Sequence, residues 1–164
     1  MSNLPEDERI AILEDEKELL NGLLAAADFK NDDGLRKLIR INRNGRLYFA
    51  FRICPISDEE ATQIRRNHTR YYDNPRGANL PKIPGETDED AVIREVIYKA
   101  TIKEDRARVW DNPEMKNKLQ IINGADAVNL LLLPGEIETV HNEISKISGY
   151  GAAARSEMLD FVKN

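Results

Sequence analysis

Hydrophobic positions recur with two different periods along the chain, and the changes of period mark the predicted elements. Apolar residues follow helical spacing up to about residue 27, alternate with polar residues between Leu47 and Ile53, and return to helical spacing from about residue 57. The alternating stretch indicates a strand. We therefore predict a mainly helical α+β fold in which several helices pack on one β-hairpin at about residues 35–53.

The first predicted helix runs from Pro5 to Ala27. Proline suits a first helical turn, and the acidic residues after it favour the positive end of the helix dipole. Its apolar stripe consists of Ile10, Leu13, Leu20, Leu23 and Leu24. Acidic residues crowd the first half of this helix and favour fraying. We therefore expect Leu19–Ala27 to be the packed part and residues 1–18 to form a mobile arm.

Residues of the predicted hairpin separate onto two faces. Leu47, Phe49, Phe51 and Ile53 face one way, and Tyr48, Ala50 and Arg52 face the other. Leu38, Ile39 and Ile41 belong to the preceding strand, and Asn44-Gly45 tolerates the positive φ angles of a tight turn. Two strands alone are marginal in water, so we expect helices to cover the face with Leu47, Phe49 and Phe51.

Ser57 and Glu60 have the spacing of a capping box, in which each side chain bonds the other residue's backbone N–H. They predict a helix that ends at about Tyr72. Residues 73–85 then contain three prolines and two glycines, which allow little regular structure. We predict the main loop of the fold here, as a candidate for a mobile or partner-ordered segment.

The second half of the chain is predicted to be helical. Thr87 is expected to cap a helix that ends near Thr101. Its inward residues are Ala91, Val92, Val96 and Ile97. Short turns are expected at residues 105–119, around Asn112-Pro113.

Two further helices are predicted to meet at a Leu-Pro-Gly-Glu corner within residues 123–150. Pro134 suits the first turn of the second helix, and Ser148-Gly149 supplies its stop. Residues 152–162 are predicted to form a last short helix. That helix would present Met158, Leu159, Phe161 and Val162.

Composition indicates one soluble domain, residues 1–164. Of the 164 residues, 41% are hydrophobic and 32% are charged, and the mean hydropathy is −0.56. No window approaches the roughly 18 apolar residues of a membrane span, and the acidic N-terminus lacks the pattern of a signal peptide. We therefore expect a cytoplasmic location without membrane contact.

Cys54 is the one cysteine of the chain, which excludes an intrachain disulfide and leaves a cysteine-based zinc site without its ligands. It lies between Ile53 and Pro55 at the end of an apolar strand. We expect a buried, inert thiol rather than a nucleophile.

Charge is distributed unevenly along the chain. Residues 1–33 hold ten acidic and three basic side chains, and residues 34–82 hold four acidic and eleven basic ones. Such asymmetry can steer a partner or let the acidic arm lie against the basic centre. Solvated faces with no partner are an equally good interpretation.

A basic and aromatic cluster is the strongest sign of nucleic-acid binding. Its members are Arg65, Arg66, His68, Arg70, Tyr71, Tyr72 and Arg76. Arginines can neutralise phosphates and tyrosines can stack on bases. The isoelectric point near 5.2 and the lack of any helix-turn-helix, zinc or RNA-recognition signature argue against this function.

No active site is predicted, and hence no enzyme activity, metal or cofactor. Carboxylate pairs such as Asp88 and Asp90 are expected by chance, and a spacing of two on a helix points the side chains apart. His68 and His141 lack a metal-ligand grouping, and no glycine-rich phosphate loop occurs.

Two apolar segments are candidates for a partner-binding surface. Consecutive leucines at 130–133 point around the whole of a helix, so at least one must face away from a single core. The alternative is that this run belongs to the core. The candidate partner-binding residues are Leu130, Leu131, Leu133, Met158 and Phe161.

Three segments resemble a known family. They are ICPISDEEATQIRRNHTR, IYKATIKEDRARVWDNPEM and NGADAVNLLLLPGEIETVHNEISKISGY. They hold a hairpin that ends in Pro-Ile-Ser and enters a helix, a central Ala-Thr-Ile segment, and a Gly-Glu-Ile helix that ends in Ser-Gly-aromatic. From about Leu35 to Tyr150 the chain resembles the XkdN-like tail assembly chaperones of tailed phages, defective prophages and related particles.

The resemblance implies a chaperone in the bacterial host cytoplasm that keeps the tape-measure protein soluble until the tail tube polymerises, and that is absent from the mature particle. The tail tube protein is a second expected partner, and the resemblance leaves open a longer product that arises by translational frameshifting. The chain departs from the family in its acidic N-terminus and its loop at Asn74–Gly85. Two alternatives stay open: a nucleic-acid-binding regulator that uses the basic cluster, and a structural tail or baseplate component.

Overall fold

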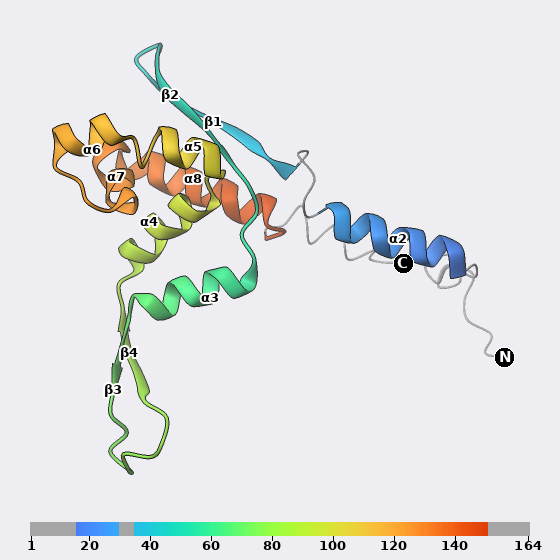
Figure 1. The fold of residues 1–164 in the computed structure, drawn as a ribbon, viewed down its shortest axis with the longest axis vertical. Helices are drawn as coiled ribbons and strands as arrows, with labels where there is room; N and C mark the ends of the chain where they lie inside the picture. Colours follow the sequence, from blue (N-terminus) through green and yellow to red (C-terminus); the bar gives the residue numbers. More distant parts are fainter. Residues whose placement is uncertain (1–15, 30–34, 151–164) are drawn as a thin grey trace, which may run out of the picture. The chain divides into compact units, whose positions relative to one another are not determined.

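The computed structural model describes residues 16–29 and 35–150 of the chain. Within these residues it contains seven helices and two two-stranded antiparallel sheets (Figure 1). The predicted mainly helical α+β class is confirmed. The chain divides into two compact units, Met1–Leu35 and Arg36–Asn164, which we describe separately. The single domain expected from composition stays a prediction.

The first unit contains α2 (Glu16–Phe29), and the residues before Glu16 lie outside the described part. Its leucines, Leu19, Leu20, Leu23 and Leu24, are between 44% and 59% exposed. The expectation that Leu19–Ala27 is well packed is therefore wrong. Helical spacing aligns the leucines on one stripe, but a stripe becomes buried only where another element covers it.

The second unit begins with the predicted hairpin, which is confirmed. Strand β1 (Lys37–Arg43) pairs antiparallel with β2 (Arg46–Ile53). Asn44 and Gly45 have φ angles of +52° and +77°. Two positive φ values in a two-residue loop match the twist of the flanking strands, which is why Asn-Gly is favoured there.

A β-bulge changes which residues lie on the inner face of this hairpin, so the predicted inner face is wrong at Leu47. Ile41 pairs with Phe49, but Asn42 pairs with Leu47, so Tyr48 is an extra residue on β2. A one-residue shift exchanges the two faces of a strand. Leu47 is consequently 53% exposed, although its spacing from Phe49 predicted a buried position.

The capping box at the start of α3 (Asp58–Asn67) is confirmed. The Glu60 N–H donates to Ser57 Oγ at 3.1 Å, and the Ser57 N–H donates to Glu60 Oε2 at 3.3 Å. The helix ends at Asn67 rather than at Tyr72, which corrects the prediction.

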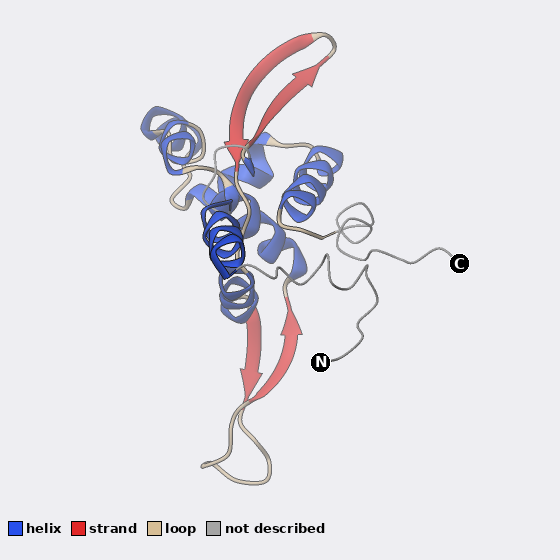
Figure 2. Cartoon of the chain, turned by 90° about the vertical axis from the view of Figure 1, so that its right-hand side faces the viewer, coloured by secondary structure: helices blue, strands red, loops and turns tan. Residues whose placement is uncertain are grey.

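A second hairpin replaces the end of that predicted helix and part of the predicted loop. Strand β3 (Thr69–Tyr72) pairs antiparallel with β4 (Ile83–Thr87), so the loop contains only residues 73–82. The hydroxyls of Thr69 and Thr87 lie 2.7 Å apart across the pair. Figures 1 and 2 show this hairpin projecting from the helices.

Glycine at position 85 of the second hairpin lets a tyrosine ring pack closely on the strand. A Cβ atom there would lie 2.2 Å from Cε2 of Tyr72, because the tyrosine ring lies across the neighbouring strand. An aromatic ring over a strand glycine restores packing that the glycine cannot supply.

Helix α4 (Glu89–Ala100) contacts α3, α7 and α8. Its cap is Asp88 rather than the predicted Thr87, with the Ala91 N–H donating to Asp88 Oδ1 at 3.1 Å. The predicted inward residues Ala91, Val96 and Ile97 are buried and Val92 is half-buried, as expected.

Four more helices follow α4. The short helices α5 (Lys103–Arg108) and α6 (Pro113–Leu119) occupy the segment predicted as turns, so that prediction is wrong. The predicted pair is confirmed as α7 (Gly124–Leu131) and α8 (Pro134–Ile147), with Gly149 at φ +96° after the second helix.

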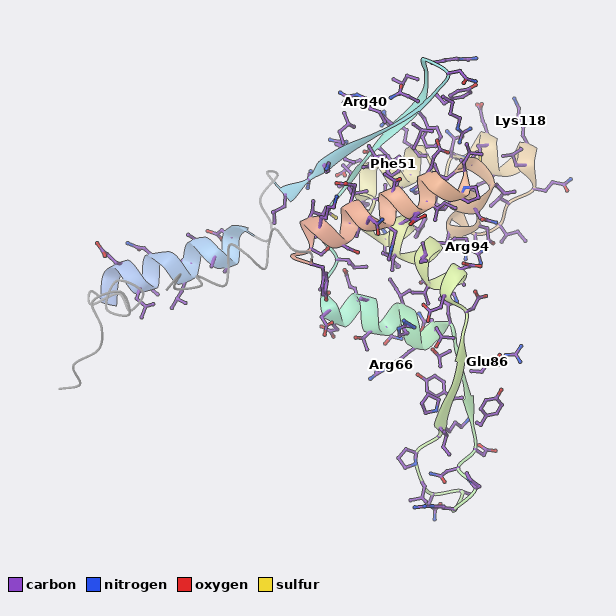
Figure 3. All side chains as sticks on the ribbon, turned by 180° about the vertical axis from the view of Figure 1, so that it is seen from behind. Arg40, Phe51, Arg66, Glu86, Arg94 and Lys118 are labelled. Atoms are coloured by element: carbon purple, nitrogen blue, oxygen red, sulfur yellow. The ribbon has the colours of Figure 1, made fainter. Side chains whose placement is uncertain are left out.

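The core lies between the inner face of the first hairpin and the helices, where Figure 3 labels Phe51. Phe51 and Trp110 are fully buried, with ring centroids 5.1 Å apart. Trp110 Nε1 donates to the hydroxyl of buried Thr101 at 2.9 Å, which satisfies the polar atom of the indole. Other large buried side chains are Ile53, Ile97, Val128, Val140 and Ile144.

One buried carboxylate joins β2 to the helices. Asp105 Oδ2 accepts from the backbone N–H of Arg52 at 2.8 Å and from Arg52 Nε at 3.0 Å, and Oδ1 accepts from Arg52 Nη2 at 3.0 Å. Arg108 Nη2 donates to the same Oδ1 at 3.2 Å. These hydrogen bonds, from Arg52 above all, hold the pKa of Asp105 below its ordinary value.

Replacing Asp105 with asparagine should lower the free energy of unfolding at pH 7 by about 1–3 kcal/mol, because a neutral amide forms weaker hydrogen bonds with Arg52. The contribution of the carboxylate is full above about pH 4 and is lost as the pH falls through the lowered folded-state pKa. Urea unfolding at pH 7 and pH 3 should therefore show a smaller pH dependence in D105N than in the parent chain.

Asp126→Asn is the matched control, because Asp126 is exposed on α7. It should leave both the stability and its acid dependence within about 0.5 kcal/mol of the parent. Equal losses in D105N and D126N would contradict a special role for Asp105.

Candidate partner-binding site

The leucine run at the corner between α7 and α8 divides between core and surface. Leu130 and Leu133 are 62% and 55% exposed, whereas Leu132 is 4% exposed and belongs to the core. Leu131 is half-buried against the core. The structure thus places Leu130 and Leu133 on the surface and leaves Leu131 half-buried.

The backbone of the corner explains why Leu133 faces solvent. Leu132 and Leu133 are extended, with ψ angles of 142° and 154°, and Pro134 then begins α8. A residue before proline is driven out of the helical region, which separates the two helices and turns Leu133 away from both axes.

Glu136 fixes this corner to the first hairpin. It accepts from the Leu133 N–H at 2.7 Å and from Arg43 Nε and Nη2 at 3.2 and 2.6 Å. Arg43 Nη2 also donates to the carbonyl of Leu131 at 2.7 Å. The hydrogen bonds from Arg43 are the main reason that the pKa of Glu136 lies below its ordinary value.

A hollow of about 450 Å³ lies on one flank of α8, which we call the β1–α8 groove. Its walls come from Ile39 to Asn42 of β1 and from Leu133, Gly135, Glu136, Thr139 and Val140. Exposed Leu133 therefore borders a concave, partly apolar surface.

A second hollow of about 490 Å³, the α4–α8 furrow, lies on the other flank. Ile93, Pro134 and Ile137 supply its apolar part, and Asp90, Arg94 and Glu138 supply charged groups. Arg94 is labelled on α4 in Figure 3.

His141 lines both this furrow and a further hollow of about 270 Å³ that reaches Ser148. The two hollows thus follow α8 from Pro134 to Ser148, a length of about 21 Å at 1.5 Å per residue. A helix of several turns has a comparable length. Burial of His141 holds its pKa below the ordinary histidine value, so its ring is neutral at pH 7.

The predicted nucleic-acid residues come from three elements rather than from one helix. Arg65 and Arg66 lie on α3, Arg70 and Tyr71 lie on β3, and Arg76 lies in the loop. Arg65 Nη1 is ion-paired with Glu89 Oε1 at 2.7 Å, and His68 is hydrogen-bonded to Glu95. Arg66, labelled in Figure 3, and Tyr71 are exposed.

Several exposed apolar residues were missed by the sequence analysis. Ile122 is 94% exposed, and Leu119, three residues earlier, is also exposed. Gln120 has a φ of +55°, in the left-handed region, and this turn after α6 carries Ile122 outward. A positive φ at glutamine has no signature in the sequence.

The two candidate residues Met158 and Phe161 lie outside the described residues. Among the described residues, no group of three or more His, Cys, Asp or Glu side chains is placed to hold a metal ion. In the same part of the chain, no helix has the length and apolarity to cross a membrane. Cys54 is half-buried rather than buried as predicted; its Sγ donates to the Ala100 carbonyl at 3.2 Å, and burial raises its pKa.

Protonation of His141 should destabilise the protein below about pH 6.5, because the unfolded chain binds this proton at a higher pH than the folded chain does. His141 therefore does not affect the free energy of unfolding above pH 6.5. Below pH 6.5 the free energy of unfolding falls as the pH is lowered. His141→Gln should reduce the drop in unfolding free energy between pH 7.5 and pH 5.5, measured in urea. An unchanged drop would contradict the assignment.

The chain matches none of the curated proteins. Its structure resembles the crystal structure of the protein yqbn, with 10% sequence identity and a TM-score of 0.44, over 71% of this chain and 87% of that chain. Residues 20–163 match the family described as phage XkdN-like tail assembly chaperone protein, which confirms the resemblance seen in the sequence. The chain therefore belongs to the family of XkdN-like phage tail assembly chaperones.

Proposed function

We propose that this chaperone binds the tape-measure protein and keeps it soluble until the tail tube polymerises. The observation that carries the proposal is the exposure of Leu130 and Leu133 at a corner flanked by two hollows. Exposed apolar residues beside concave surfaces are typical of protein-binding sites. Family membership supports a role in tail assembly, and the identity of the client is our inference.

The α4–α8 furrow suits a helical segment of such a client. An amphipathic helix can place one apolar face against Ile93, Pro134 and Ile137, while its polar sides meet Asp90 and Arg94. The hollows along α8 extend over about 21 Å, which corresponds to about 14 helical residues. Leu130 and Leu133 extend the apolar surface at one end.

Binding at this site should be weak enough to be reversed. Burying one exposed leucine stabilises a complex by about 1.5–3 kcal/mol at most. Loss of translational freedom and ordering of side chains cost several kcal/mol. Tube subunits can therefore displace the chaperone without any input of nucleotide energy.

The test is co-expression of this chain with its cognate tape-measure protein. Changing Leu130 and Leu133 to Asp should lower the pulled-down client and its soluble fraction by at least tenfold, because charges would be placed in the apolar contact. Leu80→Asp is the matched control, since Leu80 is exposed in the loop after β3. Both variants should keep the parent stability within about 0.5 kcal/mol.

Other results would support the alternatives. Nucleic acid that stays bound in purification, and that is released by high salt or by changing Arg65, Arg66 and Arg70 to Ala, would favour the regulator. Co-purification with mature particles would favour a structural tail or baseplate component. A client that stays soluble with L130D/L133D would overturn the proposed site.

A further inference from the structure

The outer edge of β1 is unpaired within the described residues. β1 has seven residues and one strand neighbour, β2. The other edge of β2 is engaged, because the Ile102 N–H donates to the Arg52 carbonyl at 3.0 Å. No hydrogen bond between described residues reaches the outer edge of β1. An unpaired edge presents backbone donors and acceptors that can bind another strand.

The β1–α8 groove gives access to this edge. On the α8 side, Gly135 and Thr139 are small residues one helical turn apart, and a Cβ atom on Gly135 would meet no atom within 4 Å. Ile39, Ile41 and Val140 supply the apolar wall. A second backbone can therefore approach β1 without a clash.

Ion pairs join β1 to α8 at the two ends of the groove. Lys37 pairs with Glu143 near the start of β1, and Arg43 Nη2 pairs with Glu136 at 2.6 Å near its end. The strand is thus anchored to α8 at both ends, and the groove lies between the anchors. These pairs also neutralise two of the basic residues of β1.

The basic charge of the hairpin indicates which kind of segment can bind in the groove. Residues 34–57 contain six basic and no acidic residues, in a chain with a net charge of −5. Arg40 is exposed and has no ion-pair partner among the residues that the structure describes, and Figure 3 shows it on the outer side of the hairpin. A second copy of β1 paired antiparallel about its centre would bring two Arg40 side chains together, which disfavours self-pairing. An acidic segment is complementary.

We propose that the edge of β1 binds an extended, acidic segment of a partner protein as a third strand. Side chains of a strand alternate between two faces. In the added strand, aliphatic residues would face Ile39, Ile41 and Val140, and acidic residues would lie beside Arg40. Main-chain hydrogen bonds supply affinity in this mode, and the alternating side chains supply specificity.

This surface goes beyond the site proposed for the client. The β1–α8 groove and the α4–α8 furrow lie on opposite flanks of α8, with Leu133 lining the first and Pro134 the second. The two proposed binding surfaces share Leu133 and no other residue, so an extended acidic segment and a helical client can be tested independently with changes at Arg40 and Leu130.

The probe is a labelled ten-residue peptide of alternating glutamate and valine, with an alternating lysine and valine peptide as its control. Fluorescence anisotropy with the full chain should show at least tenfold tighter binding of the glutamate peptide. In parallel, backbone amides of residues 37–43 should exchange with solvent at least tenfold more slowly when that peptide is bound. Absence of either effect would overturn the proposal.

Two N-methylated forms of the glutamate peptide distinguish a strand from a helix. One form is methylated on every valine nitrogen and the other on every glutamate nitrogen. Because successive N–H groups of a strand point to opposite edges, only one form should lose binding, by tenfold or more. Loss in both forms would indicate a helical occupant, and loss in neither would exclude edge pairing. Either result would overturn the proposal.

Variants of the chain localise the effect. Arg40→Glu should weaken binding of the glutamate peptide at least tenfold and strengthen binding of the lysine peptide. Thr139→Trp should fill the groove and prevent binding of both peptides. Arg66→Glu is the matched control, because Arg66 is an exposed basic residue on α3. A loss in R66E equal to that in R40E would mean that total charge alone drives binding, and would overturn the site.

The client proposal and the strand-edge proposal can be disproved independently of each other. L130D, on the α7 side of the corner, should still bind the glutamate peptide with parent affinity, whereas R40E should still keep the client soluble. Peptide binding lost in L130D would contradict the separation of the two surfaces.

Discussion

Asp105 holds the first hairpin against the helices, and the rest of the second unit depends on this contact. Its carboxylate accepts from both the backbone and the guanidinium of Arg52, so β2 is fixed in position and in orientation. Phe51 is thereby placed against Trp110, in the centre of the core. Both candidate surfaces border α8, and the β1–α8 groove exists only while the hairpin lies over that helix.

Local signals in the sequence predicted most of the elements. The turn at Asn44-Gly45, the capping box at Ser57 and the start of α8 at Pro134 each depend on a few neighbouring residues. Strand β3 was missed because its partner, β4, lies more than ten residues further along the chain. The bulge at Tyr48 was missed for a related reason, since strand register is set by pairing and not by spacing alone.

The candidate site could be predicted only in part. Spacing required that one of the consecutive leucines face away from the core, and the structure shows that Leu130 and Leu133 do so. Which leucines are exposed depends on the extended backbone at Leu132 and Leu133. The hollows on each side of α8 are formed by residues from distant elements, and no sequence pattern indicates them.

Glu136 connects the first hairpin to the corner between α7 and α8. One carboxylate caps the first turn of α8 through the Leu133 N–H and also holds Arg43 of β1. A force that displaces β1 therefore pulls on the same group that holds the helix start in place. Loss of this one carboxylate would therefore affect both the seating of β1 against α8 and the start of the helix.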